Sequence, residues 1–155
     1  MMINIGKPFF VLLCCGLLAS CGKAPVGPPT MQPNLLMVTF DTLRADHLGA
    51  YGGSAGLTPN FDALASKSVM FDNAYAVSST TAPSHATIFS GLYPNEHGVL
   101  KNGIELSGDV TTVAEVLRDN GYSTAAFVSS YAVNQLFGLD QGFDLYDEDF
   151  NFKRR

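Results

Sequence analysis

Two side chains of this 155-residue chain have the types and positions for hydrolytic chemistry: the hydroxyl of Thr81 and the carboxylate of Asp41. Thr81 precedes a predicted helix, whose N-terminus favours a bound phosphoryl or sulfuryl group. A hydroxyl becomes a good nucleophile when a metal or base lowers its pKa, and Asp41 can bind such a metal. The pair therefore predicts a metal-assisted hydrolase. Spacing alone leaves a plainer alternative, in which Thr81 caps the helix and Asp41 caps a turn.

Strands are predicted in the apolar runs 35–40 and 122–129, and the run 69–77 is predicted as a strand or an extended segment. Helical patterns alternate with them, which predicts an α/β sheet of mostly parallel strands with helices on both faces. In such sheets functional groups gather at strand carboxyl ends and helix N-termini, where Asp41 and Thr81 are expected. The acidic, aromatic stretch 142–150 has no clear element.

Capping residues set the limits of three predicted helices. One begins at residues 58–59, where Thr caps and Pro suits the first turn. Another covers residues 82–89 and ends at Gly91. A third opens with a capping box over residues 112–115 and ends at Gly121. The side chains expected to form their apolar faces are Phe61, Leu64, Ala65, Val113, Val116 and Leu117.

Residues 1–33 are expected to lie outside the folded domain. Residues 1–20 have the short apolar run and small-residue end typical of a secretory signal. Residues 18–21 (LASC) resemble a bacterial lipobox, which implies cleavage before Cys21 and its lipidation. An ordinary signal peptide or an uncleaved anchor is the alternative. Residues 21–33 are rich in Pro and Gly and predict a tether. Gly22 resembles outer-membrane sorting, so we expect an exported protein anchored to a bacterial membrane, facing the periplasm or surface.

The composition limits the partners and the chemistry. A net charge of −5 without a basic cluster disfavours nucleic-acid binding. Cys14 and Cys15 would leave with the signal and Cys21 would be lipidated, so no thiol remains for catalysis, zinc or a disulfide. Residues 34–155 are few for a doubly wound sheet with a complete site, so we expect the N-terminal part of a domain truncated at its C-terminus. The sequence does not indicate an oligomeric state.

Three segments together resemble the sulfatase branch of the alkaline phosphatase superfamily. They are residues 34–49 (NLLMVTFDTLRADHLG), 58–65 (TPNFDALA) and 83–99 (PSHATIFSGLYPNEHGV). They follow the family's order, and the resemblance extends over about residues 34–145. It implies an alkaline-phosphatase-like fold, with Asp41 as the first metal ligand and Thr81 at the nucleophile position.

Two residues depart from the sulfatase pattern. Sulfatases place at the position of Thr81 a Cys or Ser that is converted to formylglycine, and His85 replaces an expected Arg. Thr-x-Pro-Ser-His is instead similar to the nucleotide pyrophosphatase/phosphodiesterase branch, where the Thr hydroxyl is itself a metal-bound nucleophile. That branch implies that Asn102 holds an anionic substrate oxygen, with Lys101 a second candidate by charge. A turn before Gly103 is the alternative for Asn102.

We therefore expect a lipid-anchored, metal-dependent hydrolase of small sulfate or phosphate esters that uses a divalent ion, Ca or Zn. The chain alone is expected to have weak or no activity, because the family's later ligands lie beyond it. A phosphodiesterase or phosphotransferase and a non-catalytic surface lipoprotein are the alternatives. His47 and His97 are expected to have structural or loop roles, and the acids 147–149 to form a solvated segment rather than an ion cluster.

Overall fold

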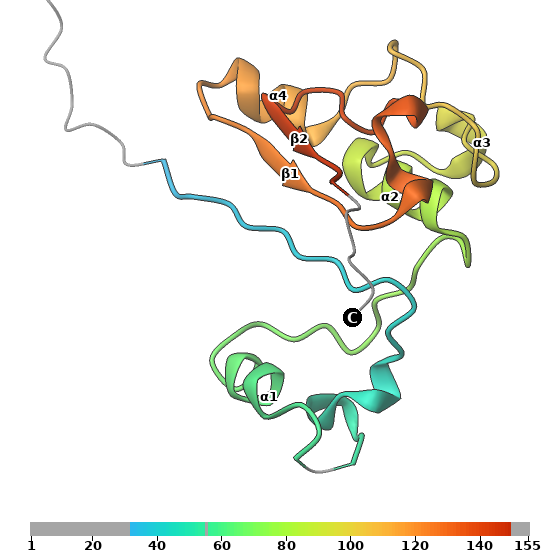
Figure 1. Ribbon diagram of the computed structural model, residues 1–155. Coiled ribbons are helices and arrows are strands. Elements are labelled where there is room, and N and C mark those ends of the chain that lie inside the picture. The colour runs from blue at the N-terminus through green and yellow to red at the C-terminus, as the bar shows by residue number, and fades with distance from the viewer. Residues whose placement is uncertain (1–31, 55, 150–155) are drawn as a thin grey trace, which may run out of the picture. The chain divides into compact units, whose positions relative to one another are not determined.

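The computed structural model describes residues 32–54 and 56–149 (Figure 1). The chain divides into two compact units, Met1–Val38 and Thr39–Arg155. The predicted signal and Cys21 lie outside the described residues, as does most of the predicted tether. In the described ranges, no helix has the length and apolar character needed to cross a membrane.

Within residues 39–54 and 56–149, the second unit contains short α-helices, two strands and four 3₁₀ turns labelled η. In chain order they are η1 (Ala45–His47), η2 (Gly49–Tyr51), α1 (Pro59–Ala65), α2 (Thr81–Ser90), α3 (Pro94–His97), α4 (Val113–Asp119), β1 (Ala125–Phe127), η3 (Tyr131–Val133), η4 (Gln135–Phe137) and β2 (Leu145–Asp147). The three predicted helices correspond to α1, α2 and α4.

The strands β1 and β2 run parallel, with Ala125 opposite Leu145 and Phe127 opposite Asp147 (Figure 1). The buried Thr124 fixes this pairing, because its backbone oxygen accepts hydrogen bonds from the N–H groups of Asp144 and Leu145 at the start of β2, and its hydroxyl donates to the Gly142 carbonyl at 2.7 Å. A parallel pair with helices is the α/β arrangement predicted from the sequence. β1 is shorter than its predicted range, and β2 occupies a stretch for which no element was predicted.

The helix α2 carries the centre of the core. Ala82 and Ala86 are fully buried one turn apart, and their small side chains let α2 pack closely against α3, η3 and α4. The other members of this buried cluster are Val99, Leu106, Val133 and Leu139. The left-handed Gly91 ends α2, as the sequence predicts. The first turn of α2 is therefore held on a packed scaffold.

The capping box of α4 forms as predicted. The Thr112 N–H donates to Glu115 Oε2 at 2.8 Å, and the Glu115 N–H donates to Thr112 Oγ1 at 3.2 Å. The Thr112 hydroxyl in turn donates to the Gln141 carbonyl at 2.9 Å, which ties the helix start to the loop before β2. The predicted apolar stripe is wrong at Val116, which is 49% exposed, because Ala114 is the residue that α4 buries.

One predicted strand does not form in the described part of the chain, because residues 35–40 contain no strand. Residues 69–77, which were predicted as a strand or an extended segment, also contain no strand and have a turn at 72–73. An apolar run becomes a strand only when a second backbone pairs with it, and its composition does not specify that partner. The inward face predicted for α1 is also wrong, because this helix buries no residue: Leu64 is 64% exposed and Phe61 is 37% exposed, although Phe61 packs edge-on against Phe40.

Tyr146 on β2 gives the fold a measurable response to alkali. Its hydroxyl donates to the Val133 carbonyl, and burial, with smaller effects from Asp140 and Glu148, raises its pKa to about 12. The unfolded tyrosine ionises near pH 10, so this group's contribution to stability is complete below pH 10 and declines as the pH rises towards 12. Tyr146→Phe should lower the free energy of unfolding by about 1 kcal/mol at pH 8. In denaturant titrations between pH 8 and 12, the free energy of unfolding should fall less steeply with pH in the variant than in the wild type. Equal slopes in the two proteins would contradict this assignment.

Candidate active site

Thr81 and Asp41 meet in the structure. Thr81 is the first residue of α2, and its Oγ1 donates a hydrogen bond to Asp41 Oδ2 at 2.7 Å. Thr80 is the N-cap residue and makes no side-chain capping bond, so neither hydroxyl caps the helix. The plainer alternative, in which Thr81 serves only as a cap, does not describe this geometry. The half-buried Thr81 instead presents its hydroxyl to an exposed carboxylate at a helix N-terminus.

The backbone turns sharply just after Asp41. Thr42 has φ of 59°, and within the described ranges it is the one non-glycine residue with positive φ. A β-branched residue is a clear outlier in this region, so the turn is strained. Asp41 therefore stands at the end of an extended run, as the sequence predicts, although that run is not a strand.

Asn102 reaches the first turn of α2 from a distant loop. Its Oδ1 accepts a hydrogen bond from the Ala82 N–H at 2.8 Å. Because an N–H needs an acceptor, this contact fixes the amide orientation, and only the Nδ2 donors remain available for a substrate. Asn102 also lies in a turn before the left-handed Gly103, so its predicted turn is present beside its contact to the helix. The neighbouring Lys101 is exposed and makes no ion pair within residues 32–54 and 56–149.

The hydrogen bond that Asn102 accepts from the Ala82 N–H predicts different stabilities for two variants of Asn102. Asn102→Ala leaves the N–H of the fully buried Ala82 without an acceptor, which should cost about 1–3 kcal/mol of stability. Asn102→Asp keeps the acceptor at a favourable helix terminus but loses the Nδ2 donors. Thermal unfolding should therefore show a loss for the Ala variant and near-native stability for the Asp variant. Equal losses would show that the cap is not the stabilising contact.

The other singled-out polar residues lie apart from this pair. His97 is 3% exposed, its Nδ1 accepts from the Val99 N–H, and its Nε2 contacts Thr87 Oγ1 at 3.1 Å. Burial lowers the pKa of His97, and these contacts give it the structural role that was expected. His47 is exposed at the end of η1. Glu148 uses its carboxylate to bind Gln135, so the acidic segment forms no ion cluster among the described residues.

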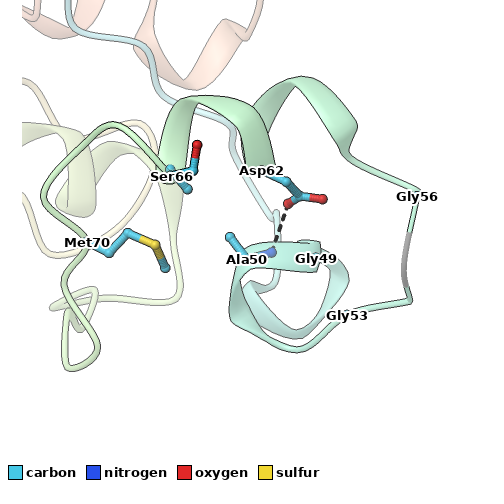
Figure 2. Close-up of a pocket in the computed structure, with 8 residues that line it drawn as sticks. Gly49, Ala50, Gly53, Gly56, Asp62, Ser66 and Met70 are labelled. Carbon is cyan, nitrogen blue, oxygen red and sulfur yellow. Dashed lines mark hydrogen bonds between the residues drawn. The ribbon is translucent and has the colours of Figure 1, made fainter.

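A shallow hollow of about 410 Å³ lies near η2 and α1, and it contains none of the predicted site residues (Figure 2). Asp62 Oδ1, on its wall, accepts hydrogen bonds from the Ala50 N–H at 2.8 Å and from the Thr58 hydroxyl at 3.1 Å. A Cβ on Gly49 would stand 2.3 Å from Asp62 Oδ2. These contacts hold η2 against α1, so we assign a structural role to Asp62 and to the hollow beside it.

The donors that meet at Thr81 suit a hard divalent cation. One carboxylate oxygen and one hydroxyl oxygen converge there, and oxygen donors favour Ca²⁺-like ions over Zn²⁺, which prefers nitrogen and sulfur. In the described ranges no group of three His, Cys, Asp or Glu side chains could hold a metal. Asp41 and Thr81 therefore fit as part of a coordination sphere.

His85 is a site residue whose contacts the sequence did not reveal. Its Nδ1 contacts the Thr81 carbonyl at 2.9 Å, and its Nε2 contacts Thr39 Oγ1 at 3.3 Å. The i, i+4 spacing from Thr81 was the available signal, because it places both residues on one face of a helix. The ring therefore touches both segments that form the site.

Comparison with known proteins identifies the family. A family model described as sulfatase matches residues 33–151. An N-acetylglucosamine-6-O-sulfatase from Bacteroides thetaiotaomicron is 34% identical over 143 residues, which cover 86% of this chain and 25% of that protein. The chain thus spans about a quarter of the length of the curated relatives it matches.

Solved structures agree with this match. The phosphonate monoester hydrolase of Agrobacterium radiobacter aligns with a TM-score of 0.65 and 29% identity, over 76% of this chain and 26% of that one. A protein bound to its substrate D-glucosamine-2-N,6-O-disulfate aligns with a TM-score of 0.58 and 33% identity, over 66% of this chain and 20% of that one. The resemblance and the fold class inferred from the sequence are confirmed. The chain belongs to the sulfatase family of the alkaline phosphatase superfamily, whose members are metal-dependent ester hydrolases.

Proposed function

We propose that this chain supplies the nucleophile side of a site that hydrolyses small sulfate or phosphate esters, with Thr81 as the nucleophile. The observation that carries the proposal is the 2.7 Å contact between Thr81 Oγ1 and Asp41 Oδ2 at the start of α2. It supports a hydroxyl oriented by a carboxylate, at a helix terminus that favours an anionic group. The sulfatase relatives support a sulfate ester as the substrate class.

The reaction has two balanced steps. Thr81 Oγ forms a bond to sulfur or phosphorus, the bond to the alcohol oxygen breaks, and that oxygen takes up the proton that the Thr81 hydroxyl gives up. Water then attacks the same centre, the bond to Thr81 Oγ breaks, inorganic sulfate or phosphate leaves, and one proton of the water restores the Thr81 hydroxyl. A bound divalent cation would be held by Asp41 and Thr81, and it would lower the pKa of the hydroxyl and offset charge on the ester. Ca²⁺ is the ion that these oxygen donors favour, with Zn²⁺ the alternative.

Three groups are placed to stabilise the ester oxygens. The N-terminus of α2 offers its partial positive charge, and Asn102 offers its Nδ2 donors beside the Ala82 N–H. Lys101, next to Asn102 and exposed, adds a positive charge. This arrangement supports the binding of a negatively charged ester.

Phosphodiester or phosphonate ester hydrolysis is the second candidate. The observation that favours it is the unmodified Thr81 followed by Pro83, Ser84 and His85, where a formylglycine sulfatase would need a Cys or Ser precursor. The structural likeness to a phosphonate monoester hydrolase supports the same branch of chemistry. Relative rates on 4-nitrophenyl sulfate and 4-nitrophenyl phosphate, compared with the rate on bis(4-nitrophenyl) phosphate, separate the two candidates.

We also propose that the protein is exported and lipid-anchored through Cys21. The support is the sequence of residues 1–21, with its apolar run, small residues and lipobox-like end. Labelled palmitate should enter the chain expressed in a Gram-negative host, and Cys21→Ala should abolish the label. Equal labelling of the Ala variant would contradict the anchor.

The decisive experiment grafts residues 33–151 into the matching segment of the N-acetylglucosamine-6-O-sulfatase relative. The chimera is assayed on 4-nitrophenyl sulfate, 4-nitrophenyl phosphate and bis(4-nitrophenyl) phosphate, with Ca²⁺, Mn²⁺ and Zn²⁺ supplied in turn. We expect release of 4-nitrophenol that a chelator abolishes. A chimera that unfolds cooperatively but is silent on all three esters contradicts the proposed function.

The 155-residue chain is assayed beside the chimera. We expect weak or no turnover from it, because its described residues bring together only part of a metal site. Robust turnover from the chain itself would show that it carries a complete site. That result would overturn the expected need for further ligands.

A further inference from the structure

We propose that His85 is a positioning residue that holds the Asp41 carboxylate against the Thr81 hydroxyl. It would do so through a Thr39–His85 bridge, defined as the contacts of the His85 ring with Thr39 Oγ1 and with the Thr81 carbonyl. The inference rests on the proposed function in one respect: that function is what makes the contact between Asp41 and Thr81 catalytic. The bridge itself is a claim about geometry.

The hydrogen bonds of the ring fix its orientation. A carbonyl oxygen only accepts, so the 2.9 Å contact with Thr81 places the proton on His85 Nδ1. Nε2 then faces Thr39 Oγ1 at 3.3 Å, and a hydroxyl can either donate to this nitrogen or accept from it. The bridge therefore forms whichever of these two groups donates the hydrogen bond.

Aromatic packing holds the ring from its other side. His85 meets Phe89 edge-on with ring centres 6.3 Å apart, and Phe89 meets Phe143 at 5.8 Å. Phe143 continues to Tyr146 on β2 at 5.7 Å. These contacts attach the imidazole to the sheet, so it is a fixed support rather than a free surface side chain.

The two partners of α2 match the helix in spacing. Thr39 contacts His85 and Asp41 contacts Thr81, so two residues of extended chain lie along one turn of α2. Alternate residues of an extended chain face the same side and advance about 6.6 Å, and four helical residues advance about 6 Å. Both contacts can therefore form together, and the bridge sets the register in which the carboxylate meets the hydroxyl.

Loss of the bridge would leave the exposed Asp41 attached to α2 by a single contact. The following turn at Thr42 is strained, and the hydrogen bond that closes it, from the Leu43 N–H to the Phe40 carbonyl, is long at 3.4 Å, so local contacts hold this placement of the carboxylate only weakly. We expect the Thr81 side chain to lose its fixed partner and to sample more than one χ1 rotamer.

The test measures the Thr81 rotamer in the full chain by NMR, from three-bond couplings between its γ-methyl carbon and the backbone. Thr39→Val removes the hydroxyl at constant shape, Thr39→Ser keeps it, and His85→Asn keeps the donor to Thr81 but cannot reach Thr39. We expect one rotamer in the wild type and in Thr39→Ser, and averaged couplings in the other two. The double variant should be no more averaged than either single one, because both remove the same bridge.

Thermal unfolding separates positioning from folding. Thr39 is exposed, so Thr39→Val should change the melting temperature by no more than about 3 °C, and it keeps the test valid if His85→Asn fails to fold. In the chimera, Thr39→Val should lower kcat roughly tenfold or more without raising KM, and Thr39→Ser should restore it.

The outcomes distinguish the bridge from the proposed function. A Thr81 rotamer that stays fixed in Thr39→Val, or is averaged already in the wild type, overturns the bridge even if the chimera is active. If the Thr81 rotamer in the full chain is fixed only when the bridge is present, and the chimera has no activity, the bridge is supported and the proposed function is refuted.

Discussion

Replacement of Thr81 by alanine should lower ester hydrolysis by the chimera by roughly 10³-fold or more, the scale on which loss of a nucleophile acts. The variant has no oxygen to attack sulfur or phosphorus, and Asp41 loses the hydrogen bond that it accepts from Thr81. Initial rates at saturating ester and metal measure the effect. Because the loss concerns the chemical step, it should appear in kcat.

Thr81→Ser is the matched control for this prediction. It keeps the hydroxyl and removes only a methyl group, so hydrolysis should remain within about tenfold of the wild type. Melting temperatures of both variants should stay close to the parent, since Thr81 is only half-buried. An alanine variant as active as the serine variant would show that another group attacks the ester.

Gly142→Ala should have the largest effect on stability, a loss of about 3 kcal/mol or more. Gly142 is buried with φ of 88°, a left-handed conformation that disfavours a Cβ. That Cβ would also lie 2.2 Å from the Glu115 backbone nitrogen, inside the capping box of α4. Backbone cannot move aside as a flexible side chain can, so strain and collision add. Denaturant titration at neutral pH measures the loss.

Gly121→Ala is the matched control, because it introduces the backbone strain without the collision. Gly121 has nearly the same φ, 85°, but a Cβ there meets nothing within 4 Å. Its replacement should therefore cost only about 1 kcal/mol, the usual penalty for a left-handed alanine. If the two variants lose equal stability, close packing between Gly142 and α4 is not what the site requires.

Local signals predicted the parts of the fold that depend on neighbours in sequence. The capping box at Thr112, the left-handed glycine after α2 and the proline at the start of α1 act within one helical turn, and each lies where it was predicted. Pairing of strands depends on distant backbone. Residues 35–40 therefore look like a strand without forming one, whereas β2 forms beside β1 within the acidic, aromatic stretch that showed no clear element.

The candidate site shows the same division. The end of an apolar run and the start of a helix suggested that Asp41 and Thr81 meet, because these ends converge in α/β folds, and the resemblance to sulfatases favoured this over two separate caps. The contact of Asn102 with the Ala82 N–H and that of His85 with Thr39 join residues far apart in sequence. Such contacts leave no periodic pattern, so only the three-dimensional structure reveals them.

The start of α2 is completed from both sides of the chain, by Asp41 from before it and by Asn102 from after it. The first turn of this helix therefore depends on two long-range contacts, and we expect it to close late in folding, because long loops must be ordered before these contacts can form. The Ala82 amide becomes a natural reporter of that event. We expect this amide to exchange slowly with deuterium only while the loop of Asn102 is docked, so that its exchange rate reports whether the start of α2 is assembled.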